Sequence, residues 1–520
     1  MFETAELGRK VPKAEYKKQV PLLREKLLAV QQDLRKADFP VILVFAGVDG
    51  AGKGEIVNLL SEWMDPRWLV THAYTEPSQE EAERPEYWRY WRDLPPRGRI
   101  GIFLSSWYST PVLDRVNNRI SVPEFDEKLD RIIAFERALA VDGALILKFW
   151  MHLGKSEQKK RLKSLEKDPE KKWRVTETDW HHWRLYDDFV AGAERAIMRT
   201  SKGAAPWDII EGGDLRYSSL TVANAVLDGV RKHLRKRTKF KEVAAQLKAA
   251  AKSGQSTAGE EAENTEDYWN KPVPRPDMPT IISTLNMDKS LSKDDYQSAL
   301  NRYQAKLNHL HRESWGHKVS SLIVFEGLDA GGKGGAIRRC TAALDARRYE
   351  VIPFAAPTDE ERAHHYLWRF WRNLGRAGRV TFFDRSWYGR VLVERVEGFA
   401  REEEWMRAFA EINDFEAQLV EHGIVLCKFW LNITPEEQLE RFKSRQEIAY
   451  KRWKLTEEDW RNRDKWAEYE IAVHDMIERT STSRAPWTLV EGNDKRFARI
   501  KVLKTLCEHM EKALKRLQKN

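Results

Sequence analysis

The sequence predicts an α/β protein made of two tandem copies of one domain, each a parallel sheet covered by helices. Three observations lead to this prediction. Long stretches repeat at a constant offset of 280 residues, apolar strand-like runs alternate with helical stretches, and each copy has a glycine-rich turn after its first strand. With 520 residues, the chain is long enough for two or three domains with their own cores.

The repeat is most evident around the glycine-rich turns. Residues 41–54 read VILVFAGVDGAGKG, and residues 321–334 read SLIVFEGLDAGGKG. The same offset aligns residues 88–108 with residues 368–388 without an insertion. A period this long indicates duplicated whole domains and not a solenoid of short repeats.

A change in composition separates the two copies. Lys, Ala, Gly, Ser and Glu dominate residues 237–262, and four prolines follow between positions 272 and 279. This composition is typical of a linker. We therefore expect a first domain over residues 1–250, a linker over 251–280 and a second domain over 281–520.

Each copy is predicted to begin with an amphipathic helix and to continue with five strands. Apolar residues precede the first turn at helical spacing, at Leu23, Leu27 and Val30, and apolar or aromatic residues stand 280 positions later. The strands expected in the first copy, each repeated 280 residues later, lie near 41–46, 68–74, 100–104, 143–150 and 208–211. Strands that alternate with helices favour a parallel sheet covered on both faces.

The turn of the second copy matches the phosphate-binding pattern G-x-x-x-x-G-K, the Walker A loop. Its glycines are Gly327, Gly331, Gly332 and Gly334. They let backbone N–H groups converge on phosphate oxygens at the start of a helix, and Lys333 adds a positive charge. Asp329 lies inside the loop, where an acid repels phosphates unless a metal intervenes, so we expect it to bind Mg²⁺. A single match could be a simple glycine turn, but two matches, each between a strand and a helix, favour phosphate binding.

A second acid is expected at the end of a neighbouring strand, the Walker B position where P-loop folds hold Mg²⁺. The predicted strand 380–383 is followed directly by Asp384 and Arg385. We expect Asp384 to share the metal with Asp329, and Arg385 to neutralise charge on a transferring phosphoryl group. The alternative is a structural Asp–Arg salt bridge at the strand end.

The first copy lacks this acidic and basic pair. Leu104 and Ser105 stand at the two positions, although Ser-Trp-Tyr follows in both copies. A leucine cannot bind a metal, and serine carries no charge to meet the phosphoryl oxygens. We therefore expect the first domain to keep the fold but not catalysis, even though Asp49 and Lys53 are retained.

The overall composition is that of a cytoplasmic protein with a polyanionic partner. The formal net charge is +9 and the pI is about 9.1, which favours nucleic acid, an acidic membrane face or a phosphate-rich substrate. The three cysteines form no C-x-x-C pair, which disfavours a disulfide framework or a zinc site. No run of 18 apolar residues occurs, so no membrane-spanning helix is expected.

Basic residues surround the predicted site. Arg390 follows the Asp384 strand and Lys428 ends the next one, and both could line a track for a chain of phosphates. For each residue taken singly, solvated surface charge is the alternative. A charged helical region over about 435–470 is expected to form a lid that closes over the phosphates and excludes water. The alternative for this region is a solvated helical hairpin.

Five segments of the second copy resemble the polyphosphate kinase 2 family. They read GLDAGGKG, DRSWYGR, CKFW, KRWKLTEEDW and TSTSRAPW. The resemblance covers nearly all of both copies and implies a P-loop kinase-like fold with a helical lid, Mg²⁺, and inorganic polyphosphate as phosphoryl donor. It places the family's loop and strand-end residues at Asp329, Lys333, Asp384 and Arg385, and its lid arginines at Arg441 and Arg445.

The two-copy architecture is similar to family members that phosphorylate AMP to ADP, so the same reaction is expected here. Single-copy members often use nucleoside diphosphates, and the acceptor therefore follows from architecture and from no single residue. Three alternatives stay open: a polyphosphate-dependent nucleoside diphosphate kinase, an NTP-dependent small-molecule kinase, and a polyphosphate-binding module without turnover. Nucleic acid and membranes are not expected partners, and association between copies of the chain stays open.

Overall fold

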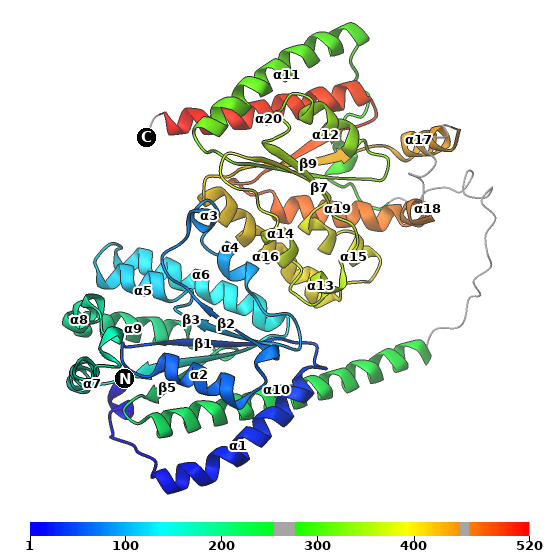
Figure 1. Cartoon of the computed structure of the whole chain (residues 1–520). Coiled ribbons are helices and arrows are strands. Elements are labelled where there is room, and N and C mark those ends of the chain that lie inside the picture. Colours follow the sequence, from blue (N-terminus) through cyan, green and yellow to red (C-terminus); the bar gives the residue numbers. More distant parts are fainter. Residues whose placement is uncertain (254–275, 448–456, 519–520) are drawn as a thin grey trace. The chain divides into compact units, whose positions relative to one another are not determined.

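The computed structural model describes residues 1–253, 276–447 and 457–518 (Figure 1). Contacts between Cα atoms divide the chain into two units. The first unit contains residues 1–77, 89–258 and 359–365, and the second contains residues 78–88, 259–358 and 366–520. Residues 78–88 are thus assigned to the second unit although their neighbours in sequence belong to the first, and residues 359–365 are assigned to the first unit although their neighbours belong to the second. Most of the predicted linker lies outside the described residues, and the functional domains 1–250 and 281–520 stay a prediction.

The first unit has a five-stranded parallel sheet in the order β2-β3-β1-β4-β5. Its strands are β1 (Val41–Gly47), β2 (Leu69–Ala73), β3 (Ile100–Leu104), β4 (Leu145–His152) and β5 (Trp207–Glu211). Its helices are α1 (Lys13–Leu34), α2 (Lys53–Trp63), α4 (Trp88–Arg92), α5 (Ser109–Val116), α6 (Val122–Val141), α7 (Lys155–Lys167), α8 (Glu177–Arg184), α9 (Tyr186–Thr200) and α10 (Leu215–Ser253).

Helices cover both faces of this sheet. In Figure 1, α1, α2 and α10 lie on one side of the strands, and α5, α6 and α9 lie on the other. The central strand β1 is therefore buried on both faces, and its residues 41–45 form an uninterrupted apolar run instead of an alternating one. The predicted stripe of α1 is also confirmed, because Leu23, Leu27 and Val30 are all buried.

The second unit repeats this architecture, with the strand order β7-β8-β6-β9-β10. Its strands are β6 (Ser321–Gly327), β7 (Tyr349–Pro353), β8 (Val380–Asp384), β9 (Val425–Asn432) and β10 (Trp487–Glu491). Its helices are α11 (Lys293–Gly316), α12 (Lys333–Thr341), α14 (Trp368–Trp371), α15 (Val393–Val396), α16 (Glu402–Glu421), α17 (Pro435–Glu447), α18 (Glu457–Asp464), α19 (Trp466–Thr480) and α20 (Lys495–Leu517). The short α3 (Gln79–Ala82) is assigned to this second unit as well, and the short α13 (Asp359–Arg362) is assigned to the first unit.

The register of the second sheet decides where its loops emerge. Strand β6 lies in the centre, and all its neighbours run parallel to it. Phe325 pairs with Asp384 of β8, and Gly327 pairs with Leu431 of β9. The glycine-rich turn after β6 and the strand end of β8 therefore lie at the same edge of the sheet, where open α/β sheets bind their ligands.

All ten predicted strands are present, so the predicted α/β class with a parallel sheet in each copy is confirmed. The predicted lid corresponds to α17 and α18, and the residues between these helices, 448–456, lie outside the described part of the chain. Within the described residues, no helix combines the length and the apolar character needed to cross a bilayer.

Candidate active site

The glycine-rich loop of the second unit connects β6 to α12. Gly327 has a φ of 152°, and a Cβ atom there would lie 2.5 Å from the backbone oxygen of Leu431. Gly332 has a φ of 105° and caps α12 in the left-handed conformation. Both positions favour glycine, because a side chain would clash or strain the backbone. The turn therefore presents the N-terminus of α12 at the loop, which suits an anion.

Lys333, the first residue of α12, reaches back over the loop. Its Nζ donates to the backbone oxygens of Gly327 at 2.6 Å and Leu328 at 3.4 Å. The ammonium group is therefore held beside the turn, where a phosphate on the loop would meet it. Gly331 lies in the loop, whereas Gly334 is the second residue of α12, and a Cβ on Gly334 would meet no atom within 4 Å.

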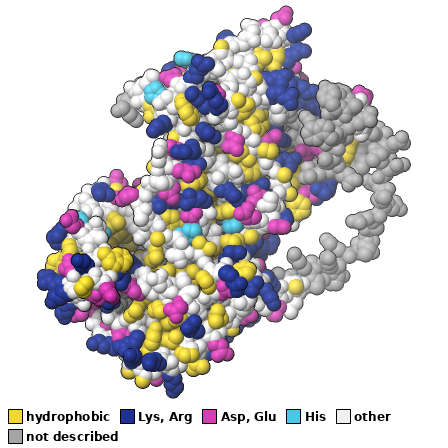
Figure 2. All heavy atoms as spheres, viewed as in Figure 1, with side chains coloured by type: hydrophobic (Ala, Val, Ile, Leu, Met, Phe, Trp, Pro, Cys, Tyr) yellow, Lys and Arg dark blue, Asp and Glu magenta, His cyan; other side chains and the backbone are white. Residues whose placement is uncertain are grey.

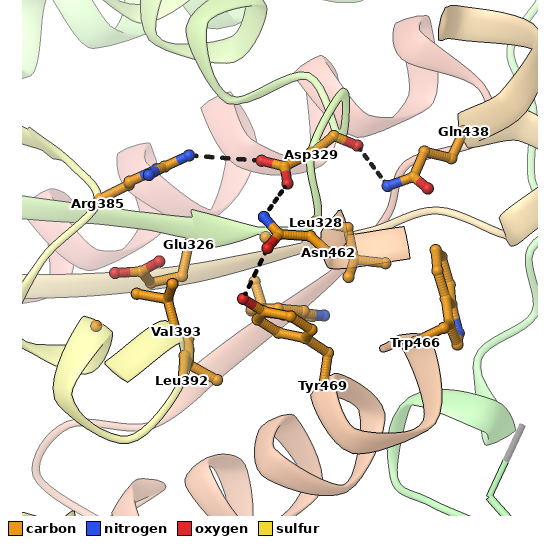
Figure 3. A pocket seen from close by; sticks show the side chains of 13 residues that line it. Glu326, Leu328, Asp329, Arg385, Leu392, Val393, Gln438, Asn462, Trp466 and Tyr469 are labelled. Carbon is orange, nitrogen blue, oxygen red and sulfur yellow. Dashed lines mark hydrogen bonds and ion pairs between the residues drawn. The ribbon is translucent and has the colours of Figure 1, made fainter. Parts of the chain in front are cut away.

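Asp329 is the centre of a hydrogen-bond network at the mouth of the loop (Figure 3). Asn462 Nδ2 donates to one carboxylate oxygen at 2.8 Å, and Arg385 lies 3.5 Å from the other. Gln438 donates to the backbone oxygen of Asp329 at 3.1 Å, and Tyr469 donates to Asn462 at 3.1 Å. The carboxylate is thus oriented by groups from β8's strand end and from the two lid helices.

Asp384 and Arg385 lie at the same edge as this network. Asp384 is the last residue of β8 and pairs with Phe325 in the register of the sheet. Arg385 adopts a φ of 67°, in the left-handed region, and its backbone N–H donates to Phe325 at 3.0 Å. The turn that begins here points the guanidinium group toward Asp329 (Figure 3). The structure therefore brings the four residues predicted to be catalytic to one edge of one sheet.

Glu326 is a further acidic residue at this edge that the sequence analysis did not single out. It is 5% exposed and accepts a hydrogen bond from Ser386 Oγ at 2.8 Å. Burial raises the pKa of Glu326, while Ser386, Lys333 and Arg385 favour its ionised form. Position 46 of the first copy is alanine, so comparing the two copies at the offset of 280 would have revealed the difference.

A pocket opens between the loop and the lid helices. Its polar end contains Asp329, Arg385 and Asn462. Its walls are mostly apolar, and they include Leu328, Leu392, Val393, Trp430, Trp466 and Tyr469 (Figure 3). A cavity with a charged end and apolar walls suits a ligand with a phosphate at one end and a flat ring at the other. Gln438, Asn462, Trp466 and Tyr469 were not predicted, because only the folded lid brings them to the loop.

The structure does not support the predicted phosphate-binding role of Lys428. This side chain is 1% exposed, and its Nζ donates to Glu416 at 2.7 Å, Tyr388 at 2.9 Å and the backbone oxygen of Thr480 at 2.8 Å. Lys148 makes the equivalent bonds in the first unit. Because all three donor positions are used inside the core, Lys428 is a structural residue of β9 and does not reach the site.

Replacing Lys428 with Met is expected to destabilise the second unit by about 3–5 kcal/mol, because Glu416 would be left as a buried charge without its partner. Thermal unfolding of the full chain should show a lower melting temperature for one transition. The control is Lys443→Met on α17, an exposed lysine that pairs with the exposed Glu440 at 3.2 Å, which should change stability little. Unchanged stability in the Lys428 variant, together with weaker phosphate binding, would restore the original prediction.

Arg441 also differs from its predicted role of contacting phosphates. It is 6% exposed and donates to the backbone oxygens of Ala330 at 2.8 Å and Gly492 at 2.6 Å, and to Glu437 at 2.6 Å. Its guanidinium group therefore braces the glycine-rich loop from the protein side.

Two other predicted phosphate ligands lie near the site without lining the pocket. Arg390 pairs with Glu394 at 3.2 Å and lies over the ring of Tyr366. Arg445 lies in the last turn of α17. Their phosphate contacts stay a prediction.

In the corresponding loop of the first unit, Asp49 forms ion pairs within the unit. Asp49 lies 2.7 Å from His182 and 3.6 Å from Lys53. Although burial opposes ionisation, Lys53 and His182 lower the pKa of Asp49 to about 2. Leu104 and Ser105 stand where the second unit has its Asp–Arg pair.

Glu326 has no counterpart in the first unit either. With alanine at position 46, Ser106 Oγ is buried without a hydrogen-bond partner in the described part of the chain. Yet Ser105 keeps a positive φ of 49°, so the turn itself survives. The first unit thus retains the loop with its Asp49 and Lys53 and lacks the strand-end Asp–Arg pair and the buried glutamate.

Comparisons with known proteins agree with this picture of a duplicated domain. The family model described as polyphosphate kinase 2 matches residues 10–238 and again residues 290–518. A polyphosphate:AMP phosphotransferase from Pseudomonas aeruginosa is 49% identical over 519 residues, which cover 99% of this chain and 100% of the relative. One from Acinetobacter johnsonii is 37% identical over 92% of each chain. A crystal structure of a polyphosphate kinase 2 protein from Pseudomonas aeruginosa superimposes with a TM-score of 0.85, at 47% identity and 99% coverage of both chains.

Proposed function

The chain belongs to the polyphosphate kinase 2 family, and on that premise we propose that it transfers a terminal phosphoryl group from inorganic polyphosphate to AMP, giving ADP. Two full-length relatives with the same two-copy architecture carry this activity in their names. The geometric observation that supports the proposal is that one of the two units has all the charged groups expected of a phosphoryl-transfer site. Only the second unit combines a glycine-rich loop, its lysine, and an Asp–Arg pair at the neighbouring strand end.

The chemistry requires two highly charged anions to approach each other. The phosphate of AMP, with a second pKa near 6, is already largely a dianion at neutral pH, so it needs no general base. The barrier that the protein must lower is therefore electrostatic repulsion, together with the alignment of the attacking oxygen. Lys333 and Arg385 supply positive charge on two sides of the loop mouth, where both reactants would meet.

The pocket beside the loop supports a nucleotide as acceptor. Asp329 and Arg385 mark the end where phosphates would lie, and Leu392, Val393 and Trp466 form apolar walls away from it. This arrangement would hold a nucleobase while its phosphate faces the loop. Asn462 comes from α18 of the lid and bonds Asp329 directly, so closing of the lid and orientation of the carboxylate are connected. A closed lid would also exclude water, which would otherwise compete as the phosphoryl acceptor.

The donor set fits a magnesium ion. In proteins, Mg²⁺ usually takes one or two carboxylates, several waters and substrate phosphates. No group of three or more potential His, Cys, Asp or Glu ligands occurs within residues 1–253, 276–447 and 457–518. At the edge of the second sheet, Asp329 and Asp384 are the proposed ligands, and the buried Glu326 bonds to Ser386 instead. The two aspartates would hold the ion, which would supply charge neutralisation between donor and acceptor phosphates.

A donor comparison tests the proposal. The purified full chain, Mg²⁺ and AMP are incubated with polyphosphate or with ATP as sole donor, and ADP is measured by chromatography. We expect ADP from polyphosphate at a rate well above that from ATP. A parallel reaction with ADP as acceptor addresses the nucleoside diphosphate kinase alternative, which predicts faster turnover with ADP. ADP formation from ATP alone would identify an NTP-dependent kinase, and binding of polyphosphate without any product would leave only a binding module.

A further inference from the structure

The first lid helix of the first unit carries a row of four lysines. On α7, Lys155, Lys159, Lys163 and Lys167 follow one another at intervals of four residues, and we call them the lysine stripe. Residues four apart lie above one another on a helix, at a rise of about 6 Å. Lys159, Lys163 and Lys167 are exposed, and Lys155 is 39% exposed. The four positions therefore form a row that winds by about 120° around the helix from its first lysine to its last.

The catalytic copy has nothing similar at this place. Helix α7 contains six basic and two acidic residues, a net charge of +4. Its counterpart α17 contains three basic and four acidic residues, a net charge of −1. At the stripe positions α17 has Pro435, Leu439, Lys443 and Glu447. The lid helix is therefore strongly basic in the copy that lacks the Asp–Arg pair and slightly acidic in the copy that keeps it.

The stripe sits on a well-packed support. Leu162 and Gln158, each 2% exposed, anchor α7 in the core and lie beside the stripe on the helix, three residues after Lys159 and Lys155. Trp183 of α8 donates from its indole N–H to the backbone oxygen of Lys155 at 3.1 Å, and its ring lies 4.6 Å from the Nζ of Lys159. Lys155 also pairs with Asp187 at 2.5 Å. Trp183 therefore holds the N-terminal part of the stripe in place.

A row of four lysines spaced four residues apart is unusual for a helix surface that only faces solvent. Like charges four residues apart destabilise a helix, and exposed helices usually alternate the sign of their charges. The stripe contains three such like-charged pairs in succession. At the edge of the first unit where α7 lies, dark blue Lys and Arg side chains reach the surface among acidic and apolar ones (Figure 2). An arrangement that costs helix stability is explained if a polyanion neutralises it.

We propose that the lysine stripe is a second binding site for the inorganic polyphosphate chain, separate from the catalytic loop. The proposal rests on the proposed function, because polyphosphate is the polyanion that this enzyme must bind. A linear chain of phosphates presents charge at regular intervals, and a row of ammonium groups can neutralise it without requiring a fixed orientation. A long donor anchored on the first unit would be present at a raised local concentration for the second unit of the same molecule. The copy that has lost catalysis would then serve donor binding.

The test is the triple substitution Lys159→Gln, Lys163→Gln and Lys167→Gln in the full chain. We expect the KM for long-chain polyphosphate to rise about tenfold and its salt dependence to become weaker, because three charge contacts are lost. The KM for AMP, the kcat, and the KM for tripolyphosphate, which is too short to span the lysine stripe, should stay unchanged. Removing repulsion between lysines should leave the melting temperature equal or higher.

The matched control is Lys17→Gln, Lys18→Gln and Lys26→Gln on α1, three exposed lysines of the same unit. An equal loss in both variants would assign the effect to net charge and overturn the proposal, as would an unchanged KM in the stripe variant. Direct binding of long-chain polyphosphate and of single-stranded DNA is measured in an Asp384→Asn background. Loss of DNA binding alone would assign the stripe to nucleic acid and would also overturn the proposal. Because binding needs no turnover, this measurement decides the question even if the proposed AMP reaction is not observed.

Discussion

Replacing Asp384 with Asn is expected to lower kcat for AMP phosphorylation by about 10³-fold, while the chain stays folded. The substitution keeps the size of the side chain and removes the charge that would hold Mg²⁺ together with Asp329. Since Asp384 ends β8 in register with Phe325, its backbone is fixed by the sheet, and the change should stay local. Initial rates of ADP formation at saturating Mg²⁺, polyphosphate and AMP measure the effect.

The first copy offers a matched control for this variant. Leu104 stands at the equivalent strand end of β3, so Leu104→Asn introduces the same side chain at the same place in the other sheet. We expect that variant to keep full activity. If Asp384→Asn retained wild-type kcat, the assignment of the metal site to this sheet edge would be wrong.

Lys333→Ala is expected to reduce kcat/KM by about 10²- to 10³-fold. Its ammonium group is held at the loop by the backbone oxygens of Gly327 and Leu328, so it is already placed where phosphate charge would develop. Without it, the helix N-terminus and Arg385 would face the phosphates alone. Both kcat and the KM for polyphosphate should change, because in the proposed reaction the lysine would contact the donor before and during transfer.

Lys53 is the counterpart of Lys333 in the first unit, where its Nζ donates to Gly47 and lies 3.6 Å from Asp49. Lys53→Ala should leave the rate of ADP formation unchanged, because no Asp–Arg pair accompanies it. If the Lys53 variant lost activity and the Lys333 variant did not, the active copy would be the first one.

The strands and the loop could be predicted from the sequence because their signals are local. Residues 41–47 and 321–327 are short apolar runs that end in glycine, and parallel strands covered on both faces require such runs. Because the offset of 280 is constant, each residue of one copy can be compared with its equivalent in the other copy. Leu104 against Asp384 is the most informative of these differences.

The phosphate-binding roles predicted for Lys428 and Arg441 gain no support from the structure, because a basic residue in a strand or helix can point to the core or to the ligand, and these two point to protein groups. Lys428 lies within β9, and its partner Glu416 comes from α16, twelve positions earlier in the chain. Arg441 turns toward the carbonyl oxygens of the loop and of residues 492–493. Charge and spacing do not determine such directions, because they depend on which helix packs against which face.

The sequence by itself determined the duplicated α/β architecture, the phosphate loop and the copy that retains the catalytic pair, because each of these depends on residues adjacent in the chain or related by the repeat. Only the tertiary structure decided which side chains meet at the loop. Asn462 and Gln438 reach it from the two lid helices α18 and α17. Their approach is fixed by packing over long sequence distances, and such contacts leave no local pattern in the sequence.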